Sequence, residues 1–268
     1  MDRRTLLLGG LGLVAACAAP ESSLLDDVDV DAIVLRPGAP APSTTLPVTP
    51  DEATTSAPPE IATVPPEDLV DLSFVARAVG PTVEVHTEPD GALDVTLDNP
   101  IPSGGPLVFL VDELADGWYR VLVPLRPNGR TGWVRADQVS LTRHNYRLRV
   151  ELSAFRLDAF DHGELFFTAP TGVARDNTPT PGGRYYITEL LQPPEPDSVY
   201  GLYAYGLSGY SEVLETFAGG PGQLGIHGTN DPSTIGRKVS HGCIRLRNED
   251  IAQLVPILPL GTPVEVIA

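Results

Sequence analysis

The chain contains few cysteines, few lysines and no apolar segment long enough to cross a bilayer. Its 2 cysteines, Cys17 and Cys243, cannot form the set of internal disulfides that stabilises many small secreted domains. Its 18 basic residues, of which Lys238 is the only lysine, are outnumbered by 35 acidic ones, for a net charge of −17. Because no basic stripe is available to neutralise phosphates, nucleic acid is not an expected partner.

The amino terminus predicts export. Paired arginines, Arg3 and Arg4, precede the apolar run 6–14, which is too short for a permanent membrane-spanning helix. The small residues before Cys17 resemble a bacterial lipobox, so we expect residues 1–17 to be a lipoprotein signal peptide that ends at a lipidated Cys17. The arginines also resemble a twin-arginine signal, which the sequence does not separate from the general secretory route. An ordinary cleaved signal peptide is the alternative.

Residues 18–68 are rich in proline, alanine and threonine and almost free of aromatic side chains. Such a composition cannot bury enough apolar surface to offset the entropy lost on folding, and proline keeps the chain extended. We therefore predict a disordered tether between a lipid anchor and a folded body. A propeptide without a spacing role is the alternative.

Residues 69–142 are predicted to form a small β-barrel. Short runs of alternating apolar and polar residues indicate strands, and Asn128-Gly129 is typical of a hairpin turn. The runs 117–119 (Gly-Trp-Tyr) and 132–134 (Gly-Trp-Val) resemble the SH3-like modules found beside bacterial cell-wall enzymes. We expect both tryptophans to pack in the core, with ligand stacking as the alternative.

Residues 143–268 are also rich in predicted strands, so the expected class is mostly β. Turn-forming residues at 178–183 lead into an apolar run, as expected for a rigid loop that enters a strand. Near the end, Asn248 is predicted to cap a short helix, because acidic residues follow it and apolar residues recur at helical spacing. A turn and a strand at 260–267 close the domain.

Cys243 is the only cysteine in the predicted folded part, and His227 and His241 lie near it in sequence. A thiol is only slightly ionised at neutral pH, so nucleophilic catalysis needs a base to accept its proton. His227 is the better base, because it lies on a separate stretch and can approach Cys243 from across a sheet. A zinc site built from the same residues is the main alternative, although no second cysteine supports it, and a structural cysteine is another.

Four runs in the second half carry a family resemblance: 178–182 (Thr-Pro-Thr-Pro-Gly), 227–230 (His-Gly-Thr-Asn), 240–246 (Ser-His-Gly-Cys-Ile-Arg-Leu) and 260–264 (Leu-Gly-Thr-Pro-Val). Together they resemble the catalytic domain of the L,D-transpeptidases, the YkuD-type cysteine enzymes of bacterial cell walls. The resemblance implies a YkuD-like β-sandwich catalytic domain with a short helix, at 143–268, preceded by a small SH3-like β-barrel.

The resemblance also implies catalytic roles. Cys243 would be the nucleophile and His227 its general base, with the backbone carbonyl of Gly228 orienting the imidazole. Backbone amides near His241, Gly242 and Cys243 would form the oxyanion hole, and the His241 side chain would shape the pocket. No metal or organic cofactor is implied.

Substrate-binding roles follow from the same resemblance. Arg245 would pair with a carboxylate of the peptide stem, a role that suits its bidentate guanidinium, although some relatives carry asparagine there. Ser240, Thr229 and Asn230 would complete the substrate-binding set.

The implied reaction joins two peptidoglycan stem peptides. Cys243 would attack the carbonyl of the third stem residue, release the terminal D-alanine and form a thioester, which an amine of a neighbouring stem resolves as a 3→3 cross-link. The resemblance further implies covalent inhibition by carbapenems. The expected location is the outer face of the bacterial cytoplasmic membrane, lipid-anchored and acting in the cell wall. The alternatives are an L,D-carboxypeptidase that hydrolyses the same thioester and a non-catalytic wall-binding lipoprotein.

Overall fold

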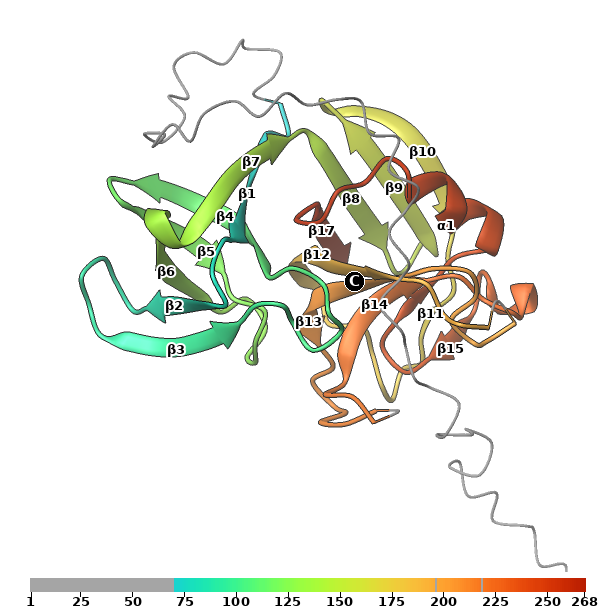
Figure 1. Cartoon of the computed structure of the whole chain (residues 1–268). Helices are drawn as coiled ribbons and strands as arrows, with labels where there is room; N and C mark the ends of the chain where they lie inside the picture. Colours follow the sequence, from blue (N-terminus) through green and yellow to red (C-terminus); the bar gives the residue numbers. More distant parts are fainter. Residues whose placement is uncertain (1–69, 196, 218) are drawn as a thin grey trace, which may run out of the picture.

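The structure is a computed structural model that describes residues 70–195, 197–217 and 219–268 (Figure 1). The predicted signal peptide with Cys17 and the predicted tether lie outside the described residues. Within the described ranges, no helix is long and apolar enough to cross a membrane. Most of the regular structure consists of strands, which confirms the predicted mostly β class.

The first body is a seven-stranded antiparallel sheet. In spatial order its strands are β3, β2, β6, β5, β4, β1 and β7. Side chains alternate between the two faces of each strand, and Val83, Phe109, Val121 and Val134 meet in a buried core. Trp118 is buried and packs edge-on against His86, as predicted for a core residue, whereas Trp133 is only half-buried. The bounds are β1 Ser73–Ala78, β2 Thr82–His86, β3 Leu93–Asp98, β4 Val108–Ala115, β5 Trp118–Leu122, β6 Thr131–Arg135 and β7 Val139–His144, with a 3-10 turn at Ala136–Gln138.

The second body contains an eight-stranded mixed sheet in the order β10, β9, β8, β17, β12, β13, β14 and β16. Strands β11 and β15 form a small parallel pair beside it. The bounds are β8 Tyr146–Glu151, β9 Arg156–Asp161, β10 Glu164–Pro170, β11 Val173–Ala174, β12 Gly183–Leu191, β13 Ala204–Tyr210, β14 Gln223–His227, β15 Lys238–Ser240, β16 Ile244–Arg245 and β17 Pro263–Ile267. A 3-10 turn spans Pro232–Thr234, and the helix α1 spans Asn248–Leu254.

The core of the second body fixes the strands that carry the predicted site. Ile226 on β14 and Ile244 on β16 are fully buried and belong to one apolar cluster. Ile251 and Leu254 of α1 are buried in the same cluster, so the helix packs against the sheet as its apolar spacing predicted. The segment between β15 and β16 therefore begins at the buried Ser240 and ends at the buried Ile244.

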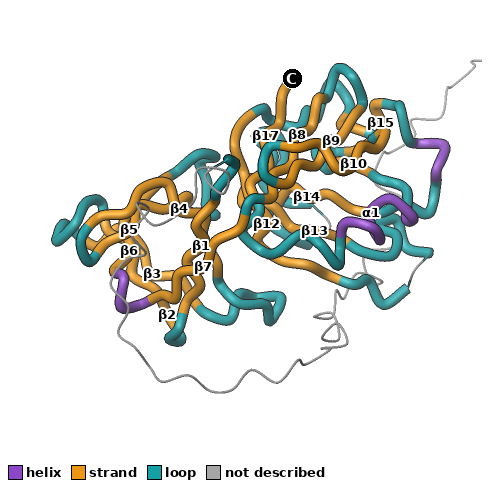
Figure 2. Tube along the Cα trace, turned by 90° about the horizontal axis from the view of Figure 1, so that it is seen from above, coloured by secondary structure: helices purple, strands orange, loops and turns teal. Residues whose placement is uncertain are grey.

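The two bodies lie side by side and share buried contacts (Figure 2). Tyr186 of β12 is fully buried, and its hydroxyl donates to the backbone carbonyl of Val108 at 3.0 Å and lies 3.3 Å from that of Leu122. Arg184 of β12 forms an ion pair with Asp112 of β4. The likeness of the first body to SH3-like modules and the predicted domain boundaries stay predictions.

Candidate active site

Two neighbouring strands bring the predicted nucleophile and base to one place. β14 and β16 pair in parallel, with His227 opposite Arg245. Side chains at alternate positions share a face, so Cys243 is expected on the same face as Arg245 and His227. A Cβ added at Gly225 would lie 3.9 Å from the Cys243 Sγ, which places the thiol beside β14. The topology thus gathers a thiol, an imidazole and a guanidinium.

The loop 240–243 is held in shape by hydrogen bonds. The Ser240 hydroxyl donates to the Cys243 carbonyl at 2.5 Å and accepts the Gly242 N–H at 3.3 Å. Thr180 donates to the Gly242 carbonyl at 2.8 Å. Gly242 has a φ of 137°, a conformation that favours glycine.

These bonds bear on two of the predicted roles. The hydroxyl of Ser240 is used inside the loop and the residue is only 2% exposed, so we propose that it positions the loop and does not bind substrate. Among the predicted oxyanion-hole amides, that of Gly242 already has an acceptor in Ser240. An oxyanion at this amide would therefore have to share or displace the Ser240 hydroxyl.

His227 is buried and oriented by its neighbour. It is 4% exposed, and its Nδ1 donates to the Gly228 carbonyl at 2.6 Å, which leaves Nε2 to accept a proton. Burial lowers the pKa of His227 to about 4, the Gly228 bond acts in the opposite direction, and the charge of Arg245 lowers it further. The imidazole is therefore neutral at neutral pH, as a general base must be. Tyr200 packs edge-on against it, with ring centroids 5.0 Å apart.

The thiol of Cys243 is free and also un-ionised. Burial raises its pKa, while the Gly225 N–H and the charge of Arg245 lower it in part. Within the described residues, no hydrogen bond joins this thiol to the imidazole of His227. Since burial disfavours the charged form of each group, the free protein holds a neutral pair, and the proton has to move as the thiol attacks.

Arg245 is half-buried beside the thiol. Its pKa is lowered, chiefly by burial, while Cys243 and Asp231 raise it. Its buried Nε has no hydrogen-bond partner among the described residues. A buried donor without a partner is unfavourable, so this guanidinium suits a ligand that brings a carboxylate.

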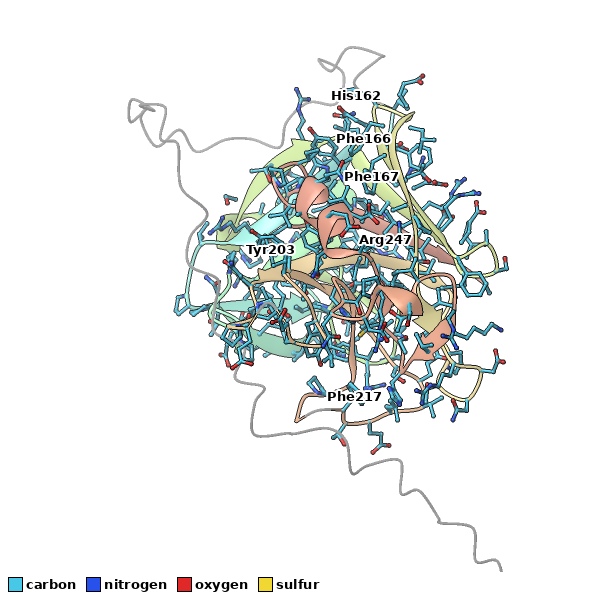
Figure 3. All side chains as sticks on the ribbon, turned by 90° about the vertical axis from the view of Figure 1, so that its right-hand side faces the viewer. His162, Phe166, Phe167, Tyr203, Phe217 and Arg247 are labelled. Atoms are coloured by element: carbon cyan, nitrogen blue, oxygen red, sulfur yellow. The ribbon has the colours of Figure 1, made fainter. Side chains whose placement is uncertain are left out.

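His241 faces an aromatic side chain from another loop. Its ring stacks on that of Phe217, with centroids 5.1 Å apart and planes 30° from parallel. Burial lowers the pKa of His241, and the charges of Arg175 and Arg245 add to the effect. Figure 3 shows Phe217 at the end of the molecule opposite to His162. The expected pocket-shaping role of His241 thus involves a residue that sequence reasoning did not select.

The prediction that Asn248 caps the helix was wrong, and this residue has a different role. The N-cap of α1 is Arg247, whose side chain makes no capping bond. The Oδ1 of Asn248 instead accepts the backbone N–H groups of Leu202 at 3.1 Å and Thr229 at 3.2 Å. A Cβ added at Gly228 would lie 2.2 Å from this oxygen, so Asn248 packs directly behind the residue that orients His227.

The two other predicted substrate-binding residues bond neighbouring loop backbone, Thr229 within its own loop and Asn230 to the loop before β13. Thr229 is 2% exposed, and its hydroxyl accepts the Asp231 N–H at 3.1 Å. Asn230 is exposed, and its amide donates to the Asp197 carbonyl at 2.8 Å. Of these two side chains, Asn230 is the one that solvent, and hence a ligand, can reach.

A cavity of about 220 Å³ lies behind the turn that contacts the nucleophile loop, and its lining includes Arg175, Thr180 and Lys238. Thr180 bonds the Gly242 carbonyl, so this cavity borders the site without containing Cys243. In the part of the chain that the structure describes, no three His, Cys, Asp or Glu residues are grouped so that they could hold a metal ion.

Sequence reasoning missed Tyr200, Phe217 and Asn248. Tyr200 lies in a turn and Phe217 in a loop, and neither belongs to a motif that the sequence analysis used. Asn248 matched a helix-start pattern, which hid its contact with distant loops. No feature of the sequence around His227 and Gly228 indicates that Asn248 contacts this run.

Comparisons with known proteins find relatives of the second body. The family model described as the L,D-transpeptidase catalytic domain (YkuD) matches residues 145–266. A Bacillus licheniformis protein named "Putative L,D-transpeptidase YkuD" is 36% identical over 121 residues, which cover 45% of this chain and 65% of that protein. The "Probable L,D-transpeptidase YbiS" of Escherichia coli is 45% identical over 76 residues, or 28% of this chain and 20% of that protein. The chain thus spans less than two thirds of the length of the Bacillus protein and one fifth of the Escherichia coli protein.

Among solved structures, L,D-transpeptidase 3 from Mycobacterium tuberculosis, in complex with a faropenem-derived adduct, matches with a TM-score of 0.38 and 18% identity, covering 54% of this chain and 76% of that one. The sequence matches agree with the predicted resemblance: residues 145–266 are similar to the YkuD-type L,D-transpeptidase catalytic domain.

Proposed function

We propose that this protein is a peptidoglycan L,D-transpeptidase that forms 3→3 cross-links through a thioester on Cys243. The proposal rests on the parallel pairing of β14 with β16, which sets His227 beside Arg245 next to the only thiol of the described residues. A neutral imidazole, a half-buried thiol and an adjacent guanidinium are groups suited to acyl transfer from an acidic peptide.

In the first half-reaction, the Cys243 sulfur attacks the carbonyl carbon of the third stem residue while His227 Nε2 takes the thiol proton. The tetrahedral oxyanion then collapses, the bond to D-alanine breaks, and His227 returns the proton to the leaving amine. This leaves a thioester and free D-alanine. Arg245 holds a stem carboxylate, since its guanidinium is half-buried and its Nε lacks a partner in the described chain.

In the second half-reaction, the side-chain amine of a second stem attacks the thioester carbonyl. His227 accepts a proton from this amine and passes it to the departing Cys243 sulfur, so the free thiol is restored and one amide bond has been exchanged for another. Water in place of the amine would give hydrolysis, the L,D-carboxypeptidase reaction. Carbapenems would acylate the same sulfur by opening their strained lactam ring.

We further propose that the protein is lipid-anchored through Cys17 to the outer face of the cytoplasmic membrane, and that residues 18–68 let the catalytic domain reach the wall. The lipobox-like residues before Cys17 and the proline-rich composition support this location. The full-length protein should partition into detergent, and Cys17→Ser should abolish that behaviour. Equal partitioning of both proteins would rule out the anchor.

The central test is mass spectrometry of the purified protein after incubation with a disaccharide-tetrapeptide. A cross-linked dimer that has lost one D-alanine, absent with Cys243→Ala, would establish transpeptidation. Free tripeptide as the only product would establish the carboxypeptidase instead. The absence of any Cys243-dependent product would reject both and favour a wall-binding lipoprotein.

A further inference from the structure

The loop between β13 and β14, of which the structure describes residues 211–217 and 219–222, contacts His241 of the nucleophile loop. Its base is closed by the Ser211 N–H, which donates to the Gly222 carbonyl at 2.8 Å. At its tip, Phe217 and Gly220 exchange two backbone hydrogen bonds of 2.9 Å. Phe217 then stacks on His241, two residues before Cys243. This loop therefore packs against the segment that carries the nucleophile.

This loop is bound by an arginine from the first body. Arg126, on the connection between β5 and β6, donates to three backbone carbonyls of the loop, those of Ser211, Leu214 and Pro221. The bonds to Leu214 and Pro221 measure 2.9 Å. One guanidinium thus joins both ends of the loop to a residue between them, with donors spread over two nitrogens of a rigid planar fork, a geometry that the compact ammonium of a lysine does not reproduce.

The surrounding residues are matched to this contact. Gly222 has a φ of 69°, and a Cβ there would lie 2.4 Å from the Leu214 carbonyl oxygen and 3.2 Å from Nη2 of Arg126. The guanidinium also lies over the ring of Tyr210, 5.2 Å from its centroid. Any larger residue at 222 would therefore collide with the Leu214 carbonyl and crowd the Arg126 guanidinium.

A second set of contacts fixes the strand that leads into the loop. The side-chain amide of Asn128 donates to the Tyr210 carbonyl and accepts the Tyr210 N–H, both at 2.8 Å. The Tyr210 hydroxyl donates to the Pro124 carbonyl at 2.8 Å. The connection 123–130 of the first body therefore binds the end of β13. Arg126, on the same connection, binds the loop that follows β13.

We propose that Arg126 is a positioning residue of the active site, through which the first body holds Phe217 against His241 and so shapes the cleft that receives the donor peptide stem. This inference rests on the proposed function for its substrate. Arg126 touches no reacting atom, so its effect on the reaction passes through the loop. The first body is then a structural part of the catalytic site.

The first test is independent of activity: hydrogen exchange of the full-length protein, Arg126→Ala against the wild type. Peptides that cover 211–222 should exchange about tenfold faster in the variant, because charge-assisted hydrogen bonds to three loop carbonyls are lost. The matched control is Arg130→Ala, on the same connection, whose guanidinium pairs with Asp94 of the first body. Unchanged loop exchange, or an equal acceleration across the whole chain, would overturn the proposal.

The second test is steady-state kinetics with the tetrapeptide stem. Arg126→Ala should raise KM about five- to tenfold with little change in kcat, since the loop shapes binding and leaves the Cys243 pair intact. Phe217→Ala should give the same effect, and the double variant should be no worse than either single variant, because both act through one contact. Arg126→Lys should restore little of the loss.

A purely structural role for Arg126 predicts a different change in kcat and KM. It would lower kcat through a smaller active fraction, leave KM unchanged and add to the effect of Phe217→Ala, and this result would overturn the proposal. If the wild type makes no product from the stem, the proposed function is the part that fails. The exchange measurement then still decides whether Arg126 holds the loop.

Discussion

Replacing Asn248 by alanine should destabilise the catalytic domain and disturb the site at the same time. Its Oδ1 accepts two backbone N–H groups, those of Leu202 and Thr229. Leaving a buried donor unsatisfied costs about 1–3 kcal/mol. Thr229 is 2% exposed and should lose the full amount, whereas Leu202 is half-buried and can recover part of it from water. We expect a loss of about 2–4 kcal/mol in the free energy of unfolding.

The same substitution should also slow the chemistry. Gly228, whose carbonyl orients His227, packs so tightly on Asn248 that a Cβ would lie 2.2 Å from its oxygen. Removing the amide opens space behind Gly228, and the imidazole loses its fixed direction. Alkylation of Cys243 at neutral pH should therefore be slower in the part of the protein that stays folded.

Urea unfolding followed by circular dichroism measures the stability change. Both tryptophans, Trp118 and Trp133, lie in the first body, so their fluorescence reports that body alone and serves as an internal control. Asn248→Asp keeps the acceptor oxygen and should retain most of the stability at neutral pH. Equal losses for Asn248→Ala and Asn248→Asp, or a loss below about 0.5 kcal/mol, would refute the role of the two hydrogen bonds.

Three further predictions concern the site. Because burial lowers the pKa of His227 to about 4, this base should be protonated only when the pH falls near that value. A plot of kcat/KM against pH should show its acid limb there, and a limb at about 6.5 would contradict the assignment of His227 as the base. Arg245→Gln should raise the pKa of Cys243, measured as a shift of the alkylation curve to higher pH, whereas the exposed Arg237→Gln should not; matching curves would remove the electrostatic role. Thr180→Val, which leaves the buried Gly242 carbonyl without its 2.8 Å donor, should cost about 1–2 kcal/mol of stability and slow acylation, with Thr216→Val as the exposed control.

Much of the fold was predictable because its signals are local. Alternation of apolar and polar residues predicted strands in both halves, and apolar spacing predicted the helix that became α1. The nucleophile run 240–246 and the His-Gly run at 227 needed no tertiary information to be singled out. Their pairing across β14 and β16 was expected only in outline, since register depends on the whole sheet.

The supporting residues were not predictable, because each acts through contacts far away in sequence. Asn248 bonds Leu202, and Arg126 bonds Leu214, across loops whose paths no local pattern fixes. A single arginine in a turn or asparagine before a helix has an ordinary local explanation, and the ordinary explanation was chosen for Asn248. Such residues are found by asking where buried carbonyls and N–H groups find their partners.

Burial of the site has a consequence for how the thiol is used. Burial raises the pKa of Cys243 and lowers that of His227, so both effects oppose a thiolate–imidazolium pair in the free protein. Only the positive charge of Arg245 and the N–H of Gly225 favour the thiolate. In the proposed reaction, thiolate character therefore develops only as the sulfur attacks and His227 takes the thiol proton, and it is absent in the free protein. A resting thiol that is protonated resists oxidation, which suits a single cysteine in the proposed extracellular location.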